Sequence, residues 1–394
     1  MLDTAPNRPS PEPPGPHRRP RRPSRLVIVA TVLALLLVPV EFSYGRALAA
    51  PGSAPVSVRT VEWLRDHGAG PVVDLVEYWV YSRNRPTGAA PDPASLPRVA
   101  SSAGATGVLP TPLPVTASGA LPGEAQWVPS AQVVGADHPL YTGYFRPDPT
   151  APSVIAGVAW MNRSLISSHL IAGTIEPVPP GTAAPADEAG GQVPTSLRPD
   201  LLATFNSGFR LKDARGGYAV NGREIRPLVD GAASLVIDTS GRITIGQWGR
   251  DVRSGPDVAA VRQNLALVVD GGAPVPGLDA NRTSAWGTSR NQLQYTWRSG
   301  LGLDAGGNLV YVAADQISLS GLAQAMTAAG IVRGMQLDIH SQTVGFLKYR
   351  PGQAASSGRG SRLLPGMHAG PVRYLEPDQR DFLAVTAAGT TSSP

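Results

Sequence analysis

The longest apolar run in the chain lies near its N-terminus. It spans Leu26 to Val40, fifteen uncharged and almost wholly apolar residues, and directly follows the basic stretch HRRPRRPSR. Basic residues ahead of an apolar stretch of this length are typical of an export signal whose positive side stays in the cytoplasm. We therefore expect the body of the protein to lie outside the cytoplasm.

This segment allows two interpretations. The small residues of ALA, at 47–49, fit the pattern of a cleavage site, although they end nine residues beyond Val40. If the apolar run instead continues to residue 45, it is long enough to cross a bilayer, which takes roughly 20 residues. The sequence thus predicts a disordered basic cytoplasmic tail over 1–25 and a single-pass transmembrane anchor over 26–45, with secretion after cleavage near Ala49 as the alternative.

The stretch after the anchor has helical periodicity and then loses it. Residues 56–85 predict two short amphipathic helices joined at GAGP, with Pro71 opening the second helix. Residues 86–130 are rich in Pro, Ala, Ser and Gly and have almost no apolar periodicity, which indicates a linker.

From residue 131 the pattern changes to short apolar strands separated by turn residues. Asn221-Gly222 is a strong signal for a two-residue hairpin, and further hairpins are expected at 239–241 and 305–308. A helix that Ser318 or Ser320 can cap ends at Gly330 and leads into the strand-like stretch GMQLDIH.

This order of elements predicts the fold class. The last strand is expected from Phe382 to Thr386, before a disordered tail over 388–394. Several hairpins followed by a helix and a strand indicate an α+β domain over 131–387, with mixed or antiparallel sheets and packed helices. The membrane helix and the short helical segment precede it.

Charge and composition exclude some functions. The chain has a formal net charge of +5, but residues 1–50 hold seven Arg against three acids, so +4 of it lies there and the rest is nearly neutral. A nearly neutral body gives no electrostatic case for nucleic-acid binding. The absence of cysteine excludes disulfides, thiol catalysis and Cys-ligated zinc.

Three predicted strands end in a polar residue beside a loop. Asn206 and Ser207 precede a glycine in ATFNSGFR, Asp270 ends the apolar stretch LALVVDGG, and Asp338 and His340 share one face of MQLDIHS. Because glycine lets the backbone approach a ligand closely, such residues can converge on one cleft.

Five motifs occur along the chain in a set order: ATFNSGF, GGYAVNG, VVDGG, RSGLGLDAGGNLVYVAAD and LSGLAQAMTAAGIVRGMQLD. In this order they resemble the phosphodiester glycosidase family, which includes the enzyme that uncovers mannose 6-phosphate by removing N-acetylglucosamine from a phosphodiester. The likeness covers about residues 150–350, and RDFLAV is similar to the family's closing strand.

One motif departs from the family. Better-known members follow the aspartate with Gly-Gly-Gly-Ser, whereas here Asp338 is followed by Ile-His-Ser-Gln. The aspartate is kept, but the glycine loop through which backbone amides approach a phosphate is not. The departure indicates an exported bacterial branch, whose substrate does not follow from that of the animal enzyme.

The resemblance implies a hydrolysis that expels a phosphate ester, a good leaving group, so the main needs are a carboxylate at the anomeric carbon and donors for the phosphodiester charge. Asp338 is the first candidate for the carboxylate and Asp270 the second, and His340 can shuttle a proton or orient Asp338. Candidates to hold the phosphate or sugar hydroxyls are Arg210, Arg298, Asn206 and Ser207.

Each candidate has a structural alternative. Asp270 precedes Gly271-Gly272 and fits a turn, Arg298 can pair with a neighbouring acid, and His340 can be a hydrogen-bonded structural imidazole. Asp338 and His340 can both reach one metal ion, but no third ligand is identifiable, so we assign no metal and leave the cofactor open.

The sequence therefore predicts an exported hydrolase that cleaves a sugar–phosphate linkage in cell-envelope or exopolysaccharide material. Its partners are the carbohydrate or sugar-phosphate substrate and the membrane, and not nucleic acid. A catalytically inactive glycan-binding or envelope-assembly protein on the same fold is the alternative.

Overall fold

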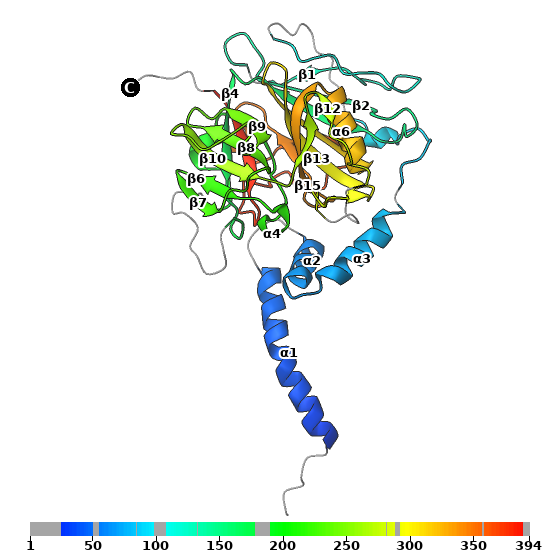
Figure 1. Cartoon of the computed structure of the whole chain (residues 1–394), viewed down its shortest axis with the longest axis vertical. Helices are drawn as coiled ribbons and strands as arrows, with labels where there is room; N and C mark the ends of the chain where they lie inside the picture. The colour runs from blue at the N-terminus through cyan, green and yellow to red at the C-terminus, as the bar shows by residue number, and fades with distance from the viewer. Residues whose placement is uncertain are drawn as a thin grey trace, which may run out of the picture. The chain divides into compact units, whose positions relative to one another are not determined.

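The structure is a computed structural model, shown in Figure 1. It describes residues 25–49, 55–83, 85–97, 108–131, 133–177, 190–280, 282–287, 292–356 and 358–388, and within the first range the side chains of residues 25 and 37–49 only. By its internal contacts the chain divides into two compact units, 1–49 and 50–394.

In the described part of the first unit there is one helix, α1 (Arg25–Ala49). Among the residues that the structure describes, no helix is both long and apolar enough to cross a membrane. Most side chains of the predicted anchor lie outside the described residues, as do residues 1–24 and 389–394 of the tails predicted over 1–25 and 388–394.

The second unit begins with the two helices that the periodicity predicts. These are α2 (Val56–Asp66) and α3 (Gly70–Tyr81), which we call the helical hairpin. Arg65 of α2 joins them, with its Nη2 atom 3.2 Å from the Asp74 carboxylate and 2.6 Å from that of Glu77.

The stretch predicted as a linker is partly packed on the domain. After a short helix, η1 (Pro93–Ser95), and the undescribed residues 98–107, Leu113 joins the core. Glu124 forms a buried ion pair of 2.8 Å with Arg146. A buried charge is stable only when it is paired and hydrogen-bonded, so this contact fixes the end of the stretch to the domain.

The domain is built on three sheets. The largest has eight strands in the order β1 (Val128–Pro129), β2 (Leu140–Phe145), β3 (Ala156–Met161), β14 (Leu309–Ile317), β13 (Thr296–Asp304), β15 (Ile331–Ile339), β11 (Leu267–Asp270) and β12 (Ala273–Pro274).

The other two sheets have five strands each. One runs β7 (Arg223–Arg226), β6 (Tyr218–Val220), β10 (Val258–Gln263), β8 (Ala233–Asp238), β9 (Ile243–Gln247), and the other runs β17 (Ser361–Arg362), β16 (Phe346–Lys348), β5 (Leu201–Asn206), β18 (Phe382–Ala387), β4 (Ile166–Ile171).

Every ladder between these described strands is antiparallel, as adjoining hairpins produce. The predicted α+β class is confirmed, and of the two sheet types expected the antiparallel one is found. The predicted hairpins are also present as β6–β7, β8–β9 and β13–β14. Other short helices among the described residues are η2 (Thr195–Leu197), α4 (Leu211–Ala214) and α7 (Gln353–Ser356).

Helix α6 (Leu319–Ala328) packs on the large sheet (Figure 1). The Ser318 hydroxyl caps it by accepting a hydrogen bond from the Gly321 amide. The Met326 side chain packs directly on the backbone of two sheet glycines, Gly300 and Gly334. A Cβ atom at these positions would come within 2.4 or 2.5 Å of it. The absence of side chains at these two sheet positions therefore sets the distance between α6 and the sheet.

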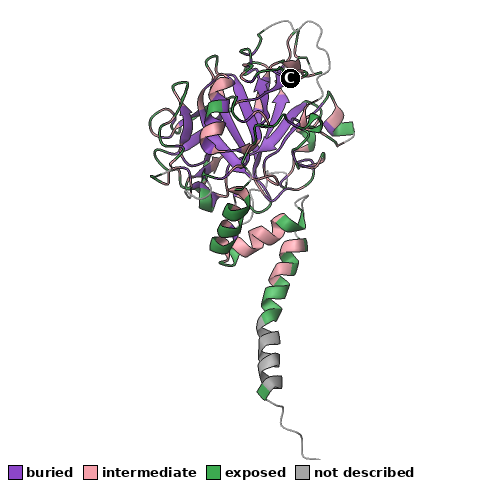
Figure 2. Cartoon of the chain, turned by 90° about the vertical axis from the view of Figure 1, so that its right-hand side faces the viewer, coloured by how far each residue is buried: buried purple, intermediate pink, exposed green. Residues whose placement is uncertain are grey.

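One core joins the three sheets. Phe205 of β5 and Phe346 of β16 stack with ring centroids 5.5 Å apart, and Tyr311 of β14 packs against both rings. The buried strands at the centre of the domain are visible in Figure 2. The end of β15 lies beside the loop after β5 and beside the residues just before β18, through contacts of Asp338 with Ser207 and Arg380.

Candidate functional site

The end of β15 presents Asp338. Its backbone amide donates to the Ser207 carbonyl (3.0 Å), and its own carbonyl accepts from the Ser299 hydroxyl (3.0 Å). One carboxylate oxygen accepts from the following amide, that of Ile339, at 2.9 Å. The backbone at Asp338 is thus fixed by contacts with β13 and the loop after β5, and its carboxylate is oriented by the Ile339 amide.

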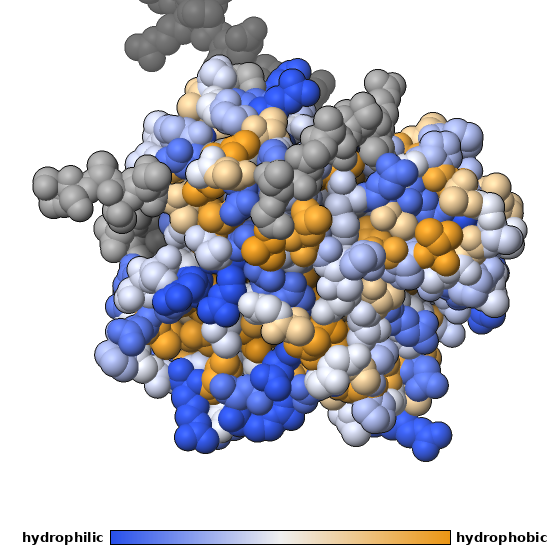
Figure 3. Space-filling model, turned by 90° about the horizontal axis from the view of Figure 1, so that it is seen from above, coloured by the Kyte–Doolittle hydropathy of each residue, from blue (hydrophilic) through white to orange (hydrophobic). Residues whose placement is uncertain are grey.

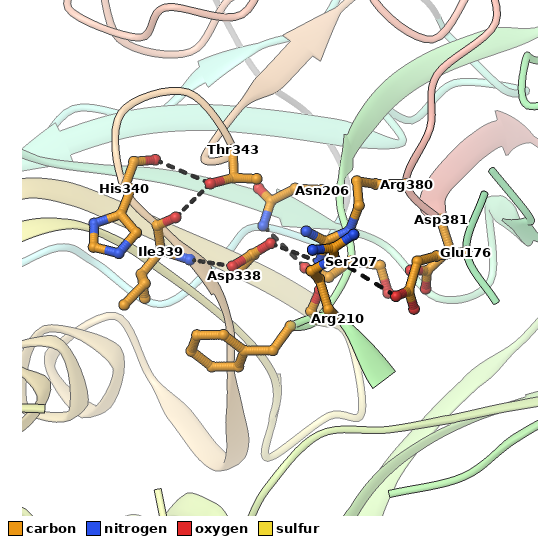
Figure 4. A network of polar contacts seen from close by, with 12 residues as sticks. Glu176, Asn206, Ser207, Arg210, Asp338, Ile339, His340, Thr343, Arg380 and Asp381 are labelled. Atoms are coloured by element: carbon orange, nitrogen blue, oxygen red, sulfur yellow. Dashed lines mark hydrogen bonds and ion pairs between the residues drawn. The ribbon is translucent and has the colours of Figure 1, made fainter. Parts of the chain in front are cut away.

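Arg380, just before β18, is the main partner of the Asp338 carboxylate. Its Nη2 atom lies 2.9 Å from Oδ2 of Asp338 and 3.2 Å from the Gly208 carbonyl. The neighbouring Asp381 forms a buried ion pair of 2.8 Å with Arg262 of β10, which fixes this turn. Figure 4 shows the Asp338 carboxylate turned toward the guanidinium groups of Arg380 and Arg210.

Burial raises the pKa of Asp338 above its ordinary value, although Arg380 opposes the rise. Burial alone would lower the pKa of Arg380, but the carboxylates around it, Asp338 first, raise it. A guanidinium stays charged in proteins in any case. The site therefore holds a permanent cation beside a carboxyl group whose protonation is easier than usual.

A pocket of about 460 Å³ opens over this pair. Its domain side is lined by residues that include Asp338, His340, Arg210, Lys212 and Arg380, and its other side by residues of the helical hairpin. The pocket thus combines two carboxyl groups of raised pKa, Asp338 and Glu77, with several cations that can bind a negatively charged substrate.

The helical hairpin places carboxylates on these cations. Glu62 lies 3.7 Å from Arg380, while Asp66 lies 3.0 Å from Arg210 and 2.8 Å from Lys212. Burial raises the pKa of Asp66, but the hydrogen bonds from Lys212 and Arg210 outweigh it and lower the pKa overall. In this structure the acids of α2 thus occupy the positions at which an anionic ligand would meet the pocket's cations.

His340 lines the same pocket but faces α3. Its ring stacks on Tyr81 with centroids 5.1 Å apart, Nδ1 lies 3.2 Å from the Thr296 hydroxyl, and Nε2 lies 3.6 Å from the Glu77 carboxylate. Burial lowers its pKa to about 3, so the imidazole is neutral and the Glu77 contact is not an ion pair. In Figure 4 the ring points away from the Asp338 carboxyl.

Asn206 and Ser207 lie behind the pocket. The Asn206 amide donates to Ser299 (3.0 Å) and to the Ser207 carbonyl (3.1 Å), and its oxygen accepts from Tyr311 and Gly345, both at 3.1 Å. The hydrogen-bonding capacity of the Asn206 side chain is thus used within the fold, in contacts with β13, β14 and neighbouring loops. The Ser207 hydroxyl is buried and has no hydrogen-bond partner among the described atoms.

Asp270 and Arg298 do not line the pocket. Asp270 forms ion pairs with Arg250 (2.6 Å) and Arg333 (3.2 Å). The Arg298 side chain is fully buried and donates to the carbonyls of Ile317 (3.0 Å) and of two glutamines, Gln292 and Gln294. Of the predicted site residues, Asp338, His340 and Arg210 line one pocket, and Asn206 and Ser207 lie next to it. Asp270 and Arg298 lie elsewhere.

Several pocket residues are absent from the candidates that the sequence suggested. Arg380 opens the quoted motif RDFLAV, but it reaches Asp338 only because the start of β18 and the end of β15 lie beside the same loop, the one after β5. Glu62 and Glu77 also line the pocket, and Asp66 pairs with two of its cations. All three belong to predicted amphipathic helices, in which a row of acids is usually a solvated face. The described residues contain no group of three His, Asp or Glu that could hold a metal ion.

Comparison with known proteins gives limited matches. No curated protein matches the chain. The catalytic domain of zebrafish N-acetylglucosamine-1-phosphodiester alpha-N-acetylglucosaminidase, auto-inhibited by its pro-peptide, is 12% identical with a TM-score of 0.40, covering 66% of this chain and 86% of that one. A hypothetical protein from Synechocystis is 13% identical with a TM-score of 0.37, covering 64% and 63%. Residues 201–344, from the start of β5 to the turn after His340, match the phosphodiester glycosidase family.

Proposed function

We propose that this pocket hydrolyses a glycosyl phosphodiester, releasing a sugar and a phosphate monoester. The observation that carries the proposal is the Asp338–Arg380 pair in a pocket that Arg210 and Lys212 also line. The match of residues 201–344 to the phosphodiester glycosidase family supports the same reaction class.

In this reaction Asp338 takes a proton from a water molecule that attacks the anomeric carbon. The bond between that carbon and the phosphate oxygen breaks, and the phosphate monoester leaves with the bonding electrons. A base whose pKa is raised toward the working pH accepts a proton more effectively than an ordinary carboxylate. The leaving phosphate ester needs little help from a general acid, so a single carboxyl group suffices.

The cations hold the phosphate. Arg380 and Arg210 can each form two parallel hydrogen bonds to phosphate oxygens, and Lys212 adds a point charge. Since Glu62 and Asp66 contact these cations in this structure, a phosphodiester must displace them to bind. We give Asp270 and Arg298 no part in the reaction, and His340 acts as a neutral wall of the pocket.

We place this activity outside the cytoplasm, on sugar–phosphate linkages of the cell envelope or of exopolysaccharide. The basis is the basic flank and apolar run at residues 18–40, which are typical of an export signal. The nearly neutral body is also compatible with a glycan substrate rather than nucleic acid.

The experiment offers a panel of glycosyl-1-phosphodiesters, including one of N-acetylglucosamine, and follows phosphorus-31 NMR in water enriched in oxygen-18. The diester signal should give way to that of a monoester, with the heavy oxygen in the sugar. Label in the phosphate instead would mean cleavage of the P–O bond and would overturn the glycosidase assignment. Asp338→Asn should lower the rate by a factor of at least about 100, since it removes the base.

Asp270→Asn is the matched control, because it is the same substitution at a residue outside the pocket. It should retain activity. Equal losses in the two variants, with both folded by circular dichroism, would contradict the role of Asp338.

The alternative is a glycan-binding or envelope-assembly protein without turnover. It is favoured by the Ile-His-Ser sequence after Asp338, which replaces the glycine loop of the better-known family members, and by the acids of α2 on the pocket's cations. No turnover on the panel together with saturable binding of a glycan by calorimetry would select this alternative.

A further inference from the structure

Helix α3 has its amphipathic faces reversed. Its acidic residues, Asp74 and Glu77, point toward the pocket, and Val73 is its only buried residue. The opposite face is apolar and faces solvent. Surface helices normally turn the apolar face inward and the charged face outward, so this helix lacks the partner that its sequence requires.

The exposed face is large for a single short helix. The side chains concerned are Val72 (63% exposed), Leu75 (54%), Val76 (56%), Trp79 (57%) and Val80 (47%). They follow the spacing of three and four residues that forms one stripe along a helix. A contiguous apolar patch of this kind marks an interaction site, whereas scattered exposed apolar residues do not. Figure 3 views the domain from above, the side away from the α3 label in Figure 1, and there hydrophobic residues are interspersed with hydrophilic ones.

Three features identify the partner. The helix follows the apolar run at 26–40 within a few tens of residues of chain, and such a run behind a basic flank is typical of a segment that reaches a membrane. Its stripe combines aliphatic residues with Trp79, and the Arg83 guanidinium lies 3.9 Å over the Trp79 ring. Tryptophan is enriched at the level of the lipid headgroups, and arginine beside it can reach their phosphates.

We propose that the exposed face of α3 binds the surface of a lipid bilayer, lying in the interface plane as an amphipathic helix. This contact differs from the predicted transmembrane anchor, because it uses the folded second unit of the chain. It also differs from the proposed hydrolysis, since the residues concerned point away from the pocket. With α3 on the lipid surface, the helical hairpin lies between the bilayer and the catalytic pocket.

The absence of cysteine from the sequence allows a direct test on the full chain. Val76→Cys is labelled with an environment-sensitive fluorophore in vesicles of phosphatidylethanolamine and phosphatidylglycerol that carry spin-labelled lipid. Apolar faces of interfacial helices lie about 5–10 Å below the headgroup boundary, so shallow spin labels should quench the probe more strongly than deep ones. A second probe, at Val72→Cys, should also be quenched more strongly by shallow spin labels than by deep ones.

Two control positions have similar exposure. Val229→Cys lies on a loop of the domain (44% exposed), and its probe should not be quenched. Val56→Cys (61% exposed) begins α2 and lies closer in sequence to the apolar run. Quenching at position 56 alone, with position 76 resembling position 229, would mean that tethering explains the proximity and would overturn the proposal. Disulfide-linked dimers of the unlabelled Val76→Cys variant, with no quenching of the labelled one, would assign the stripe to a second copy of the chain. That result would equally overturn the proposal.

Discussion

At the scale of single residues, the distinctive group is the Asp338 carboxyl. It is buried, its pKa is raised by burial, and it touches a permanent cation. Burial makes the ionised form costly, and Arg380 offsets only part of that cost. The carboxylate therefore binds a proton at a higher pH than a solvated aspartate does. This is the property expected of a catalytic base, and it depends on the position of the side chain rather than on its identity.

The first prediction concerns the pH dependence of the reaction. The base must be ionised, so kcat/KM should rise with pH through the pKa of Asp338 and then level off. Because that pKa is raised, the midpoint should lie above the ordinary aspartate value of 3.8. Initial rates from pH 3 to 9, with stability checked at each pH, give the profile.

His340 provides the control for this profile. Its pKa of about 3 means that the imidazole loses no proton between pH 5 and 8. His340→Asn should therefore keep the position of the midpoint, and asparagine suits the positive φ of 78° at this residue. A midpoint near 6.5 that disappears in His340→Asn would assign the titration to the imidazole and contradict the proposal for Asp338.

At the scale of elements, α2 acts on the pocket through its carboxylates. Partly exposed ion pairs such as Asp66 with Lys212 contribute about 0.2–1 kcal/mol each. Their removal should therefore strengthen anion binding only modestly.

The second prediction is that Asp66→Asn combined with Glu62→Gln tightens the binding of inorganic phosphate by a factor of roughly 2–30, if each of the two acids contributes about 0.2–1 kcal/mol. Calorimetry at low salt measures it, because salt screens these charges. The control variant is Glu224→Gln, on exposed strand β7, which should leave the affinity unchanged. Weaker binding in the double variant would show that the two acids do not compete with the anion.

The third prediction concerns the sheet glycines on which Met326 of α6 packs. Gly334→Ala places a Cβ atom 2.5 Å from the Met326 methyl group and 3.3 Å from the Leu301 carbonyl, so the helix or the sheet must shift. The free energy of unfolding should fall by about 1–3 kcal/mol. Gly255→Ala, where no atom lies within 4 Å of the added Cβ, is the control and should stay near the wild-type value in urea denaturation.

At the scale of the whole molecule, the hairpins, the capped α6 and the α+β class could be predicted from turn residues and periodicity, because these signals are local. The pocket could only partly be predicted. Asp338 stands out as an acid in an apolar strand, but its pairing with Arg380 depends on the ends of β5 and β15 lying beside the start of β18. Asp270, which has the same local signal, instead joins a network with Arg250 and Arg333.

Stability is unevenly distributed over the second unit. The strands around the pocket share the buried core, whereas α2 buries no residue and α3 buries only Val73. The contacts of the helical hairpin with the domain include three ion pairs at the pocket and the stacking of Tyr81 on His340. Few buried apolar contacts mean a low free energy of local opening. The hairpin should thus open without unfolding the domain, and opening exposes the cations that Glu62 and Asp66 occupy.

The fourth prediction follows from this difference. Amide hydrogen exchange over residues 56–81 should be faster than in β13, β15 and β18 by several orders of magnitude, since a core strand exchanges only through global unfolding, which costs about 5–15 kcal/mol. Raising the salt concentration should accelerate exchange in the hairpin alone, because it screens the ion pairs. Phosphate should accelerate it further at equal ionic strength if it displaces the carboxylates from Arg210 and Arg380. Protection of the hairpin equal to that of β15, unaffected by either addition, would mean that α2 and α3 are a fixed wall of the pocket.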